Sequence, residues 1–155
     1  MKTWLIPLVL LAGLLPSAAR AADPHVARQL EALGYTFEVD EDGDYKMVFT
    51  LAEGRTQVVF VRSPVEAYGT LRVREIWSPG LSVDGNAFPA AVANRLLSDS
   101  NEAKIGAWVK QGGIAMYVVK IDAAASTEQL SDAIAAAIDT ADRLEQELTL
   151  GKDEF

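Results

Sequence analysis

Residues 30–49 read LEALGYTFEVDEDGDYKMVF, and this stretch decides the fold. Its first part is the end of a helix that stops at Gly34, because glycine readily takes the left-handed conformation that ends helices. Apolar and polar residues then alternate in two runs, as they do in strands that bury one face; the apolar members are Tyr35, Phe37 and Val39, then Tyr45, Met47 and Phe49. Asp42-Gly43 lies between the runs and is a strong hairpin signal. The stretch therefore predicts a helix followed by a β-hairpin.

The same patterns extend this prediction in both directions. Asp23 and Pro24 begin the first helix as its N-cap and its first helical residue. Further strands are predicted over residues 56–62, 70–78, 104–111 and 114–121, and the first of these is apolar on both faces, which is typical of a central strand. A second helix begins at Pro89 and ends around residues 98–101, and a third, capped by Ser126, spans residues 127–148. A loop is predicted from Pro79-Gly80 to Phe88.

These elements predict one α+β domain in the order α-β-β-β-β-α-β-β-α. The domain covers residues 22–148, and no internal repeat or low-complexity linker divides it. The tail over residues 149–155 is predicted to be frayed, since chain ends are poorly ordered unless something holds them.

The first 21 residues have the parts of an export signal. Lys2 precedes an apolar run from Trp4 to Leu15, and Ala19-Arg20-Ala21 has the small-x-small pattern that signal peptidase reads. The alternative is a membrane anchor, but this run is much shorter than the about 20 residues that span a bilayer. We therefore expect cleavage after Ala21, a periplasmic or secreted bacterial protein, and no stable membrane insertion after cleavage.

The exported form is strongly acidic. The whole chain has 14 basic and 22 acidic side chains, and the leader carries two of the basic ones, Lys2 and Arg20, so 12 remain against 22 and the net charge is −10. Such a protein is repelled by phosphate backbones, so no nucleic-acid partner is expected. The absence of cysteine excludes disulfides.

The final residues suggest a second compartment. The chain ends Lys152-Asp153-Glu154-Phe155, close to the Lys-Asp-Glu-Leu address of endoplasmic-reticulum residents. Phenylalanine replaces the final leucine, and acidic ends also arise by chance in acidic proteins. Retrieval signal and chance both stay open, and the bacterial periplasm is the preferred interpretation.

Few side chains here could carry out catalysis. His25 is the one histidine of the chain, and its position after Pro24 predicts a residue in the first helical turn. Asp40 to Asp44 is the densest carboxylate cluster, but Gly43 comes too early for an EF-hand loop and strands flank it, so a solvated hairpin turn is predicted. No GxSxG, HExxH or glycine-rich phosphate motif occurs. We therefore predict no catalytic residue, no metal site and no cofactor.

The order of elements and two stretches of sequence resemble the YbjN domain family, which is related to the fold of type III secretion chaperones. The stretches are the opening one, residues 30–49, and SNEAKIGAWV, from Ser100 to Val109. The resemblance implies a twisted antiparallel sheet with helices on one face, often in a dimer, and it implies no catalytic residues. The export signal sets this chain apart from the usual member. It argues against the cytoplasmic roles that the resemblance implies, secretion-effector binding and sensory transduction regulation.

Two rows of side chains suggest a binding surface. Arg72, Arg74 and Ile76 share one side of one predicted strand, and Lys104, Trp108 and Lys110 share one side of another. If both rows lie on the sheet face away from the helices, they form a basic-aromatic patch of the kind enriched in interface anchors. The alternative is an ordinary solvated face.

The preferred function is that of a non-enzymatic periplasmic binding or chaperone-like module. It would act through protein contact, with a partner or with a second copy in a homodimer. Two alternatives stay open: a small-molecule or ion sensor subunit, and a hydrolase that depends on carboxylates alone.

Overall fold

The computed structural model describes residues 21–155, so of the predicted signal peptide, residues 1–21, only Ala21 lies within the described part. The elements of this part follow one another in an α+β order. They are α1 (Pro24–Ala32), β1 (Glu38–Val39), β2 (Tyr45–Thr50), the 3-10 helix η1 (Ala52–Gly54), β3 (Thr56–Val61), β4 (Glu66–Tyr68), β5 (Leu71–Ser82), α2 (Ala90–Glu102), β6 (Ala107–Gln111), β7 (Ile114–Asp122) and α3 (Thr127–Leu148). The predicted class and order are confirmed, and the short strand β4 is an addition to them.

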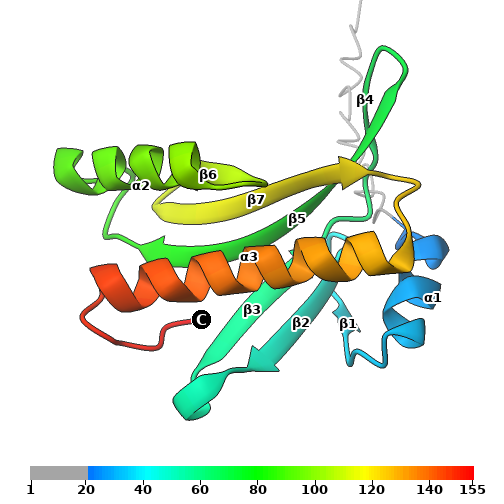
Figure 1. The fold of residues 1–155 in the computed structure, drawn as a ribbon, viewed down its shortest axis with the longest axis horizontal. Coiled ribbons are helices and arrows are strands. Elements are labelled where there is room, and N and C mark those ends of the chain that lie inside the picture. The colour runs from blue at the N-terminus through cyan, green and yellow to red at the C-terminus, as the bar shows by residue number, and fades with distance from the viewer. Residues whose placement is uncertain (1–20) are drawn as a thin grey trace, which may run out of the picture.

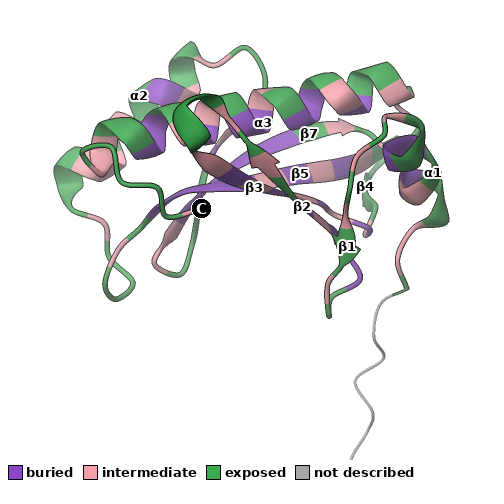
Figure 2. Ribbon diagram, turned by 90° about the horizontal axis from the view of Figure 1, so that it is seen from below, coloured by how far each residue is buried: buried purple, intermediate pink, exposed green. Residues whose placement is uncertain are grey.

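The strands form one antiparallel sheet. Their order is β1-β2-β3-β5-β7-β6, and β4 pairs only with the beginning of β5. Helices α2 and α3 lie on one side of this sheet, and within residues 21–155 no helix covers the other side (Figures 1 and 2). β4 and the start of β5 extend beyond the body of the sheet as a hairpin (Figure 1). The prediction of helices on one face of an antiparallel sheet is therefore confirmed.

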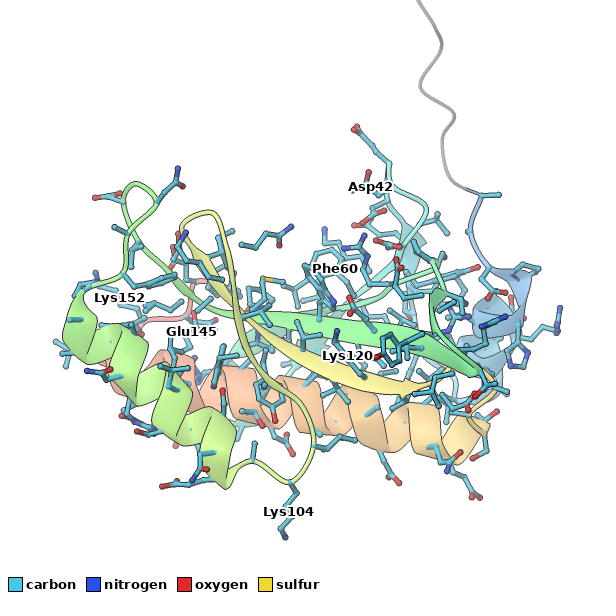
Figure 3. The ribbon with its side chains drawn as sticks, turned by 90° about the horizontal axis from the view of Figure 1, so that it is seen from above. Asp42, Phe60, Lys104, Lys120, Glu145 and Lys152 are labelled. Atoms are coloured by element: carbon cyan, nitrogen blue, oxygen red, sulfur yellow. The ribbon has the colours of Figure 1, made fainter. Side chains whose placement is uncertain are left out.

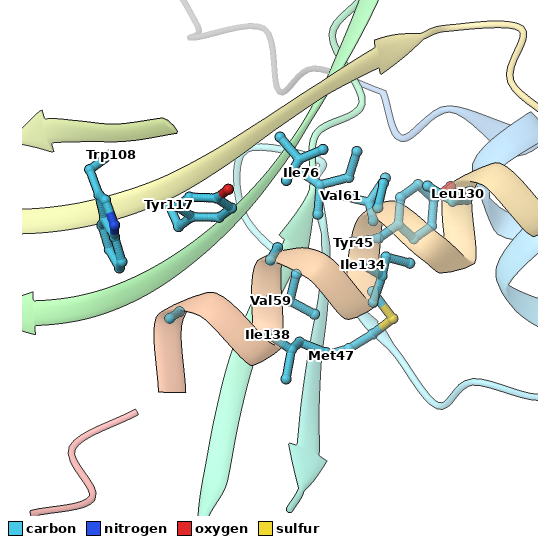
Figure 4. Packing of buried hydrophobic residues seen from close by; sticks show 14 of the residues in the cluster. Tyr45, Met47, Val59, Val61, Ile76, Trp108, Tyr117, Leu130, Ile134 and Ile138 are labelled. Atoms are coloured by element: carbon cyan, nitrogen blue, oxygen red, sulfur yellow. The ribbon is translucent and has the colours of Figure 1, made fainter. Parts of the chain in front are cut away.

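Helix α3 forms the inner wall of the hydrophobic core. Its buried apolar residues recur every three or four positions, as in any helix that buries one stripe; they are Leu130, Ala133, Ile134, Ala137, Ile138, Ala141 and Leu144. They belong to one cluster with the inward side chains of five strands, β2, β3, β5, β6 and β7, among them Met47, Val59, Ile76 and Tyr117 (Figure 4). Since side chains alternate along a strand, this cluster fixes which residues of each strand face α3 and which face away.

Local sequence explains where two of the helices begin. The Asp23 carboxylate accepts the His25 N–H at 2.8 Å, so Asp23 caps α1 and His25 lies in its first turn, as predicted. At the start of α3, Ser126 and Gln129 each accept a backbone N–H from the other, which makes a capping box. These contacts satisfy N–H groups that have no partner inside a helix.

The acidic run from Asp40 to Asp44 is a hairpin turn, as predicted. β1 and β2 pair on either side of it, and Asp40 Oδ1 accepts the backbone N–H groups of Asp42 and Asp44 at 3.0 and 2.9 Å. Gly43 has a φ of 82°, a conformation that glycine adopts without strain. The run is therefore explained by the turn that it makes.

β5 runs further than the sequence predicted. The predicted strand ended at Ser78 and a loop followed at Pro79-Gly80, but β5 continues through both residues to Ser82. Its pairing with β7 shifts register between Pro79 and Leu81. Proline has no N–H to give to a neighbouring strand and is tolerated at such irregularities. The predicted start of the loop is therefore wrong.

The C-terminal tail is held against the domain. Arg55, which follows η1, donates to the carbonyl oxygens of Gly151 and Lys152 at 3.3 and 3.2 Å. Asp153 accepts the Thr56 N–H at 3.2 Å. These contacts join the tail to the β2–β3 connection, so the prediction of a frayed tail disagrees with the structure.

A buried carboxylate anchors these contacts. Glu145 of α3 is fully buried and binds Arg55 at 2.8 Å, and it accepts the Glu154 N–H at 2.6 Å. Burial raises the pKa of Glu145, and the Glu154 N–H and the charge of Arg55 oppose this shift without cancelling it. Figure 3 shows Glu145 and Lys152 at the same end of the molecule. The tail thus closes over a charge that water does not reach.

Candidate interaction surface

The six residues of the predicted binding surface do not form one exposed patch. Arg74 and Ile76 pair with Ile121 and Val119 of β7, on the face that α3 covers. Arg74, Ile76 and Trp108 are 3%, 0% and 8% exposed. Arg72, Lys104 and Lys110 are exposed, but Lys104 precedes the first residue of β6, and the buried Trp108 lies between it and Lys110. The two rows therefore do not lie together on the face away from the helices, and the condition for a basic-aromatic patch is not met.

Arg74 lies inward because partners distant in sequence satisfy its charge. Its guanidinium forms an ion pair with Asp23, the cap of α1, and donates to the carbonyl oxygens of Arg62 and Ser63 at 2.7 and 3.0 Å. The Ser63 hydroxyl also accepts the Asp23 N–H at 3.0 Å. Arg74 thus fixes the start of the domain to β5, and its contacts are structural.

Trp108 lies inward between α2 and the sheet. Its indole N–H donates to the buried carboxylate of Asp99 at 2.8 Å, and its ring packs edge-on against Tyr117 at 5.2 Å between centroids. Asp99 also forms ion pairs with Arg143 and Arg95 at 2.7 and 3.1 Å. Burial by itself raises the pKa of Asp99, but the hydrogen bonds from Trp108 and Arg143 and the nearby positive charges outweigh it, so the pKa lies below its ordinary value.

The opposite face of the sheet carries an apolar row that no helix covers. Phe60 pairs with Trp77, Trp77 pairs with Val118, and Val118 pairs with Ala107, so these residues cross β3, β5, β7 and β6 side by side. The pairs Val48–Val58 and Val109–Met116 flank this row. We call these eight residues together the open face. Figure 3 shows Phe60 on the side of the sheet away from α3.

The accessible part of the open face lies toward its two ends. Val48 on β2 and Val109 on β6 are 59% and 38% exposed, and Val58, Phe60 and Trp77 are partly exposed. Val118 and Met116, between them, are only 3% and 5% exposed. The β4–β5 hairpin continues the same side of β5, with Tyr68 opposite Leu71 and both strongly exposed.

The charged residues beside the open face are paired with one another. Lys46 binds Glu38 at 2.7 Å, and Lys120 binds Glu75 at 2.8 Å. Arg62 forms an ion pair with Asp44, and its guanidinium stacks over the Trp77 ring at 4.8 Å from the centroid. This side of an acidic protein is therefore close to electrically neutral, and burying it against another surface leaves few charges without a partner.

Within residues 21–155, no group of three or more histidine, aspartate or glutamate side chains is placed to hold a metal ion. His25 is exposed at the start of α1. What the open face can do is bind: it offers aromatic and aliphatic area with paired charges around it.

Residues 24–150 match the model of the YbjN family, whose description is "putative bacterial sensory transduction regulator". The chain belongs to the YbjN family. The match covers the YbjN domain from the first residue of α1 to just beyond the last residue of α3. No curated protein matches the chain at a significant level. A regulator of this kind works through contacts with other molecules, which agrees with a domain whose accessible feature is an uncovered sheet face.

One pattern in the sequence already indicated the open face of this YbjN domain. Residues Val58 to Val61 are apolar on both sides of the strand, which predicted a central position in the sheet. The same fact means that Phe60 and Val58 stay apolar on the side that α3 does not cover. The candidate surface was predicted on the side of Arg74 instead, because charged side chains ordinarily point toward water. Among the described helices, none is both long and apolar enough to cross a membrane.

Proposed function

We propose that this YbjN protein is an exported, non-enzymatic binding module of the bacterial periplasm, and that it acts through the open face. The observation that carries this proposal is the apolar row from Phe60 across Trp77 to Ala107, on the side of the sheet that no helix of residues 21–155 covers. The family description supports a regulator that works by contact, and the export signal predicted for residues 1–21 supports the compartment.

The partner of the open face is a protein surface. Burying apolar side chains stabilises a complex by about 25 cal/mol for each Å² removed from water. Aromatic residues with a polar handle, such as Trp77, are enriched in the centre of such interfaces. The paired charges around the face also suit a second copy of the chain, because two copies of a strongly acidic protein repel each other least where their surfaces are neutral. Self-association is therefore the first interaction to measure.

The open face is tested with charge-introducing variants at its exposed ends. We expect Val48→Lys and Val109→Lys to leave the fold intact, since both side chains are already in contact with water, and to weaken self-association in analytical ultracentrifugation of the mature chain. Leu97→Lys is the matched control, because Leu97 is 67% exposed on α2, on the other side of the sheet.

If the mature chain is a monomer, a photoreactive residue is placed at position 48 or 97 in the native host. Cross-links to a protein at 48 and not at 97 support the proposal, and equal or no cross-linking at both positions contradicts it.

Export is tested separately. We expect the protein recovered from the periplasm to begin at Ala22, as determined by its mass. A full-length chain that stays with the cytoplasmic fraction would contradict the compartment without affecting the role of the open face.

A further inference from the structure

The second half of β7 has a partner strand on one side only. β5 pairs with β7 along its whole length, from Ile114 to Asp122. β6 pairs with β7 only from Ile114 to Val118. Among residues 21–155, no strand therefore lies along the outer edge of Val119 to Asp122. Figure 1 shows this end of β7 extending past β6 above α3.

The free edge offers backbone groups to a further strand. The Ala123 N–H donates to the Arg72 carbonyl at 2.9 Å, so the backbone groups of Ala123 point toward β5. In an antiparallel ladder the direction alternates from one residue to the next. The N–H and C=O of Lys120 and the N–H of Asp122 therefore point outward, in the direction in which β6 would continue. The carbonyl of Asp122 is used by the Ala125 N–H at 2.9 Å.

A groove runs beside this edge. It consists of two adjoining cavities of about 500 and 330 Å³, and Ile105 lines both. One stripe of α3 forms a wall of the groove, with residues at helical spacing: Gln129, Asp132, Ala133, Ala136, Asp139, Thr140 and Arg143. Its apolar surface comes from small side chains of this stripe and from Ile105 and Ile121, and Ile105 is 41% exposed. We call this feature the α3 groove.

The α3 groove carries an excess of negative charge. Asp99, at one end, is already neutralised by Arg143 and Arg95. Three other carboxylates line the groove without an ion pair inside the described part of the chain: Glu102, Asp132 and Asp139. Asp122 also lies at the groove, and its carboxylate accepts the Ala124 N–H at 2.8 Å. Lys104 is the remaining cationic side chain of the lining. A ligand that fits here carries positive charge together with apolar groups.

We propose that the α3 groove binds an extended, basic peptide segment of a partner protein, which adds to the sheet as a strand along Val119 to Asp122. An extended segment satisfies the outward backbone groups of Lys120 and Asp122, which a helix cannot do. Its side chains alternate between the two faces of the sheet, so the basic ones point toward α3 and the apolar ones lie on the opposite face. The aliphatic stems of the basic side chains pack against Ile105 and Ala136, and their charged ends reach the carboxylates of Asp132 and Asp139. This site lies on the helix-covered side and the edge of the sheet, so it is independent of the open face.

The probe is a fluorescent eight-residue peptide of alternating valine and lysine, and its binding to the mature chain is measured by anisotropy. A peptide of alternating valine and glutamate is the control ligand, and spermidine is the control for charge without a backbone. We expect only the valine-lysine peptide to bind, and Asp132→Lys with Asp139→Lys to weaken its affinity by about tenfold or more. The control is the double variant Glu66→Lys with Asp84→Lys, which makes the same change of charge at two exposed positions outside the groove. We expect it to change the affinity by no more than about twofold, because salt screens charges on distant parts of the surface.

Hydrogen exchange then tests the strand. On binding of the peptide, we expect slower exchange at the amides of Lys120 and Asp122 and no change at the amide of Val48. The proposal is overturned if the valine-glutamate peptide or spermidine binds equally well, if both pairs of lysine variants weaken binding equally, or if the peptide binds without protecting Lys120 and Asp122. Loss of self-association in the Val48→Lys variant has no bearing on this result, so the two proposals can fail separately.

Discussion

The indole N–H of Trp108 and the carboxylate of Asp99 form a 2.8 Å hydrogen bond in the contact between α2 and the sheet. Asp99 also forms ion pairs with Arg95 of α2 and Arg143 of α3. One buried carboxylate therefore connects α2, β6 and α3. We expect Asp99→Ala to lower the free energy of unfolding by about 2–3 kcal/mol, because it leaves a buried indole N–H without an acceptor. Urea denaturation measures the loss, and a change below 0.5 kcal/mol, roughly that of a surface substitution, would contradict this role.

Asp99 also predicts a dependence of stability on pH. Its pKa is lowered in the folded state, so the stability that it provides is present above its unfolded pKa and is lost as the pH falls through the folded one. Asp99→Asn cannot titrate. We therefore expect the free energy of unfolding of this variant to fall less steeply than that of the natural chain between about pH 5 and pH 2. Parallel curves over this range would show that Asp99 does not titrate in the way the structure implies.

Gly80 leaves room for the Trp108 ring. A Cβ at this position would lie 2.5 Å from Trp108 Cη2 and 3.1 Å from the carbonyl oxygen of Ala141. We expect Gly80→Ala to cost about 1–3 kcal/mol, the usual cost of overpacking a core. In a Trp108→Phe background the smaller ring removes the closest contact, so the same change should cost less. A double-mutant cycle by chemical denaturation measures the coupling, and equal costs in both backgrounds would exclude it.

Arg72 and Arg74 are two residues apart and respond differently to substitution. Arg74→Met removes the partner of Asp23 and the donor to two carbonyl groups, so we expect a loss of about 2–3 kcal/mol of unfolding free energy. Arg72 is exposed, and Arg72→Met should change stability by less than about 0.5 kcal/mol. Thermal and urea unfolding of the two variants provide the comparison. Similar losses for both would mean that Arg74 has no special structural role.

The pair Arg55–Glu145 holds the tail. Arg55→Met leaves Glu145 buried without its counter-ion, and breaking a buried ion pair in this way costs about 3–5 kcal/mol. Since burial raises the pKa of Glu145, the folded variant favours the protonated acid, and its deficit relative to the natural chain should shrink as the pH falls. Arg55→Met combined with Glu145→Gln serves as the control and should show no such recovery. A deficit independent of pH in the single variant would contradict this account.

Local patterns predicted most of the fold. The hairpin at Asp42-Gly43, the capped start of α1 and the long helix α3 are all set by residues close together in the chain, and each was found. β4 was missed because its three residues are too few for an alternating pattern. The contacts of the tail could not be predicted from local patterns, because its partners, Arg55 and Thr56, are far away in the sequence. Thr56 and Asp153, for example, are 97 residues apart.

The candidate surface was harder to predict, for a physical reason. Alternation along β5 correctly separates Arg74 and Ile76 from Val73 and Trp77, but it does not say which set faces the helices. Charge suggested that the arginines point outward. A buried arginine is stable only with partners, and Asp23 lies 51 residues away from Arg74, so no local pattern could reveal the pair.

The position of α3 in the chain has a consequence for how the molecule is made. All the strands precede this helix, yet the central ones bury their inward side chains against it. A ribosome that has released the chain as far as Asp122 has produced the entire sheet and none of the wall that it packs on. We expect stalled nascent chains ending before Thr127 to be digested by protease at every strand, and chains released through Phe155 to resist it. The strands therefore have to wait for the synthesis of α3 before they can pack into the native sheet.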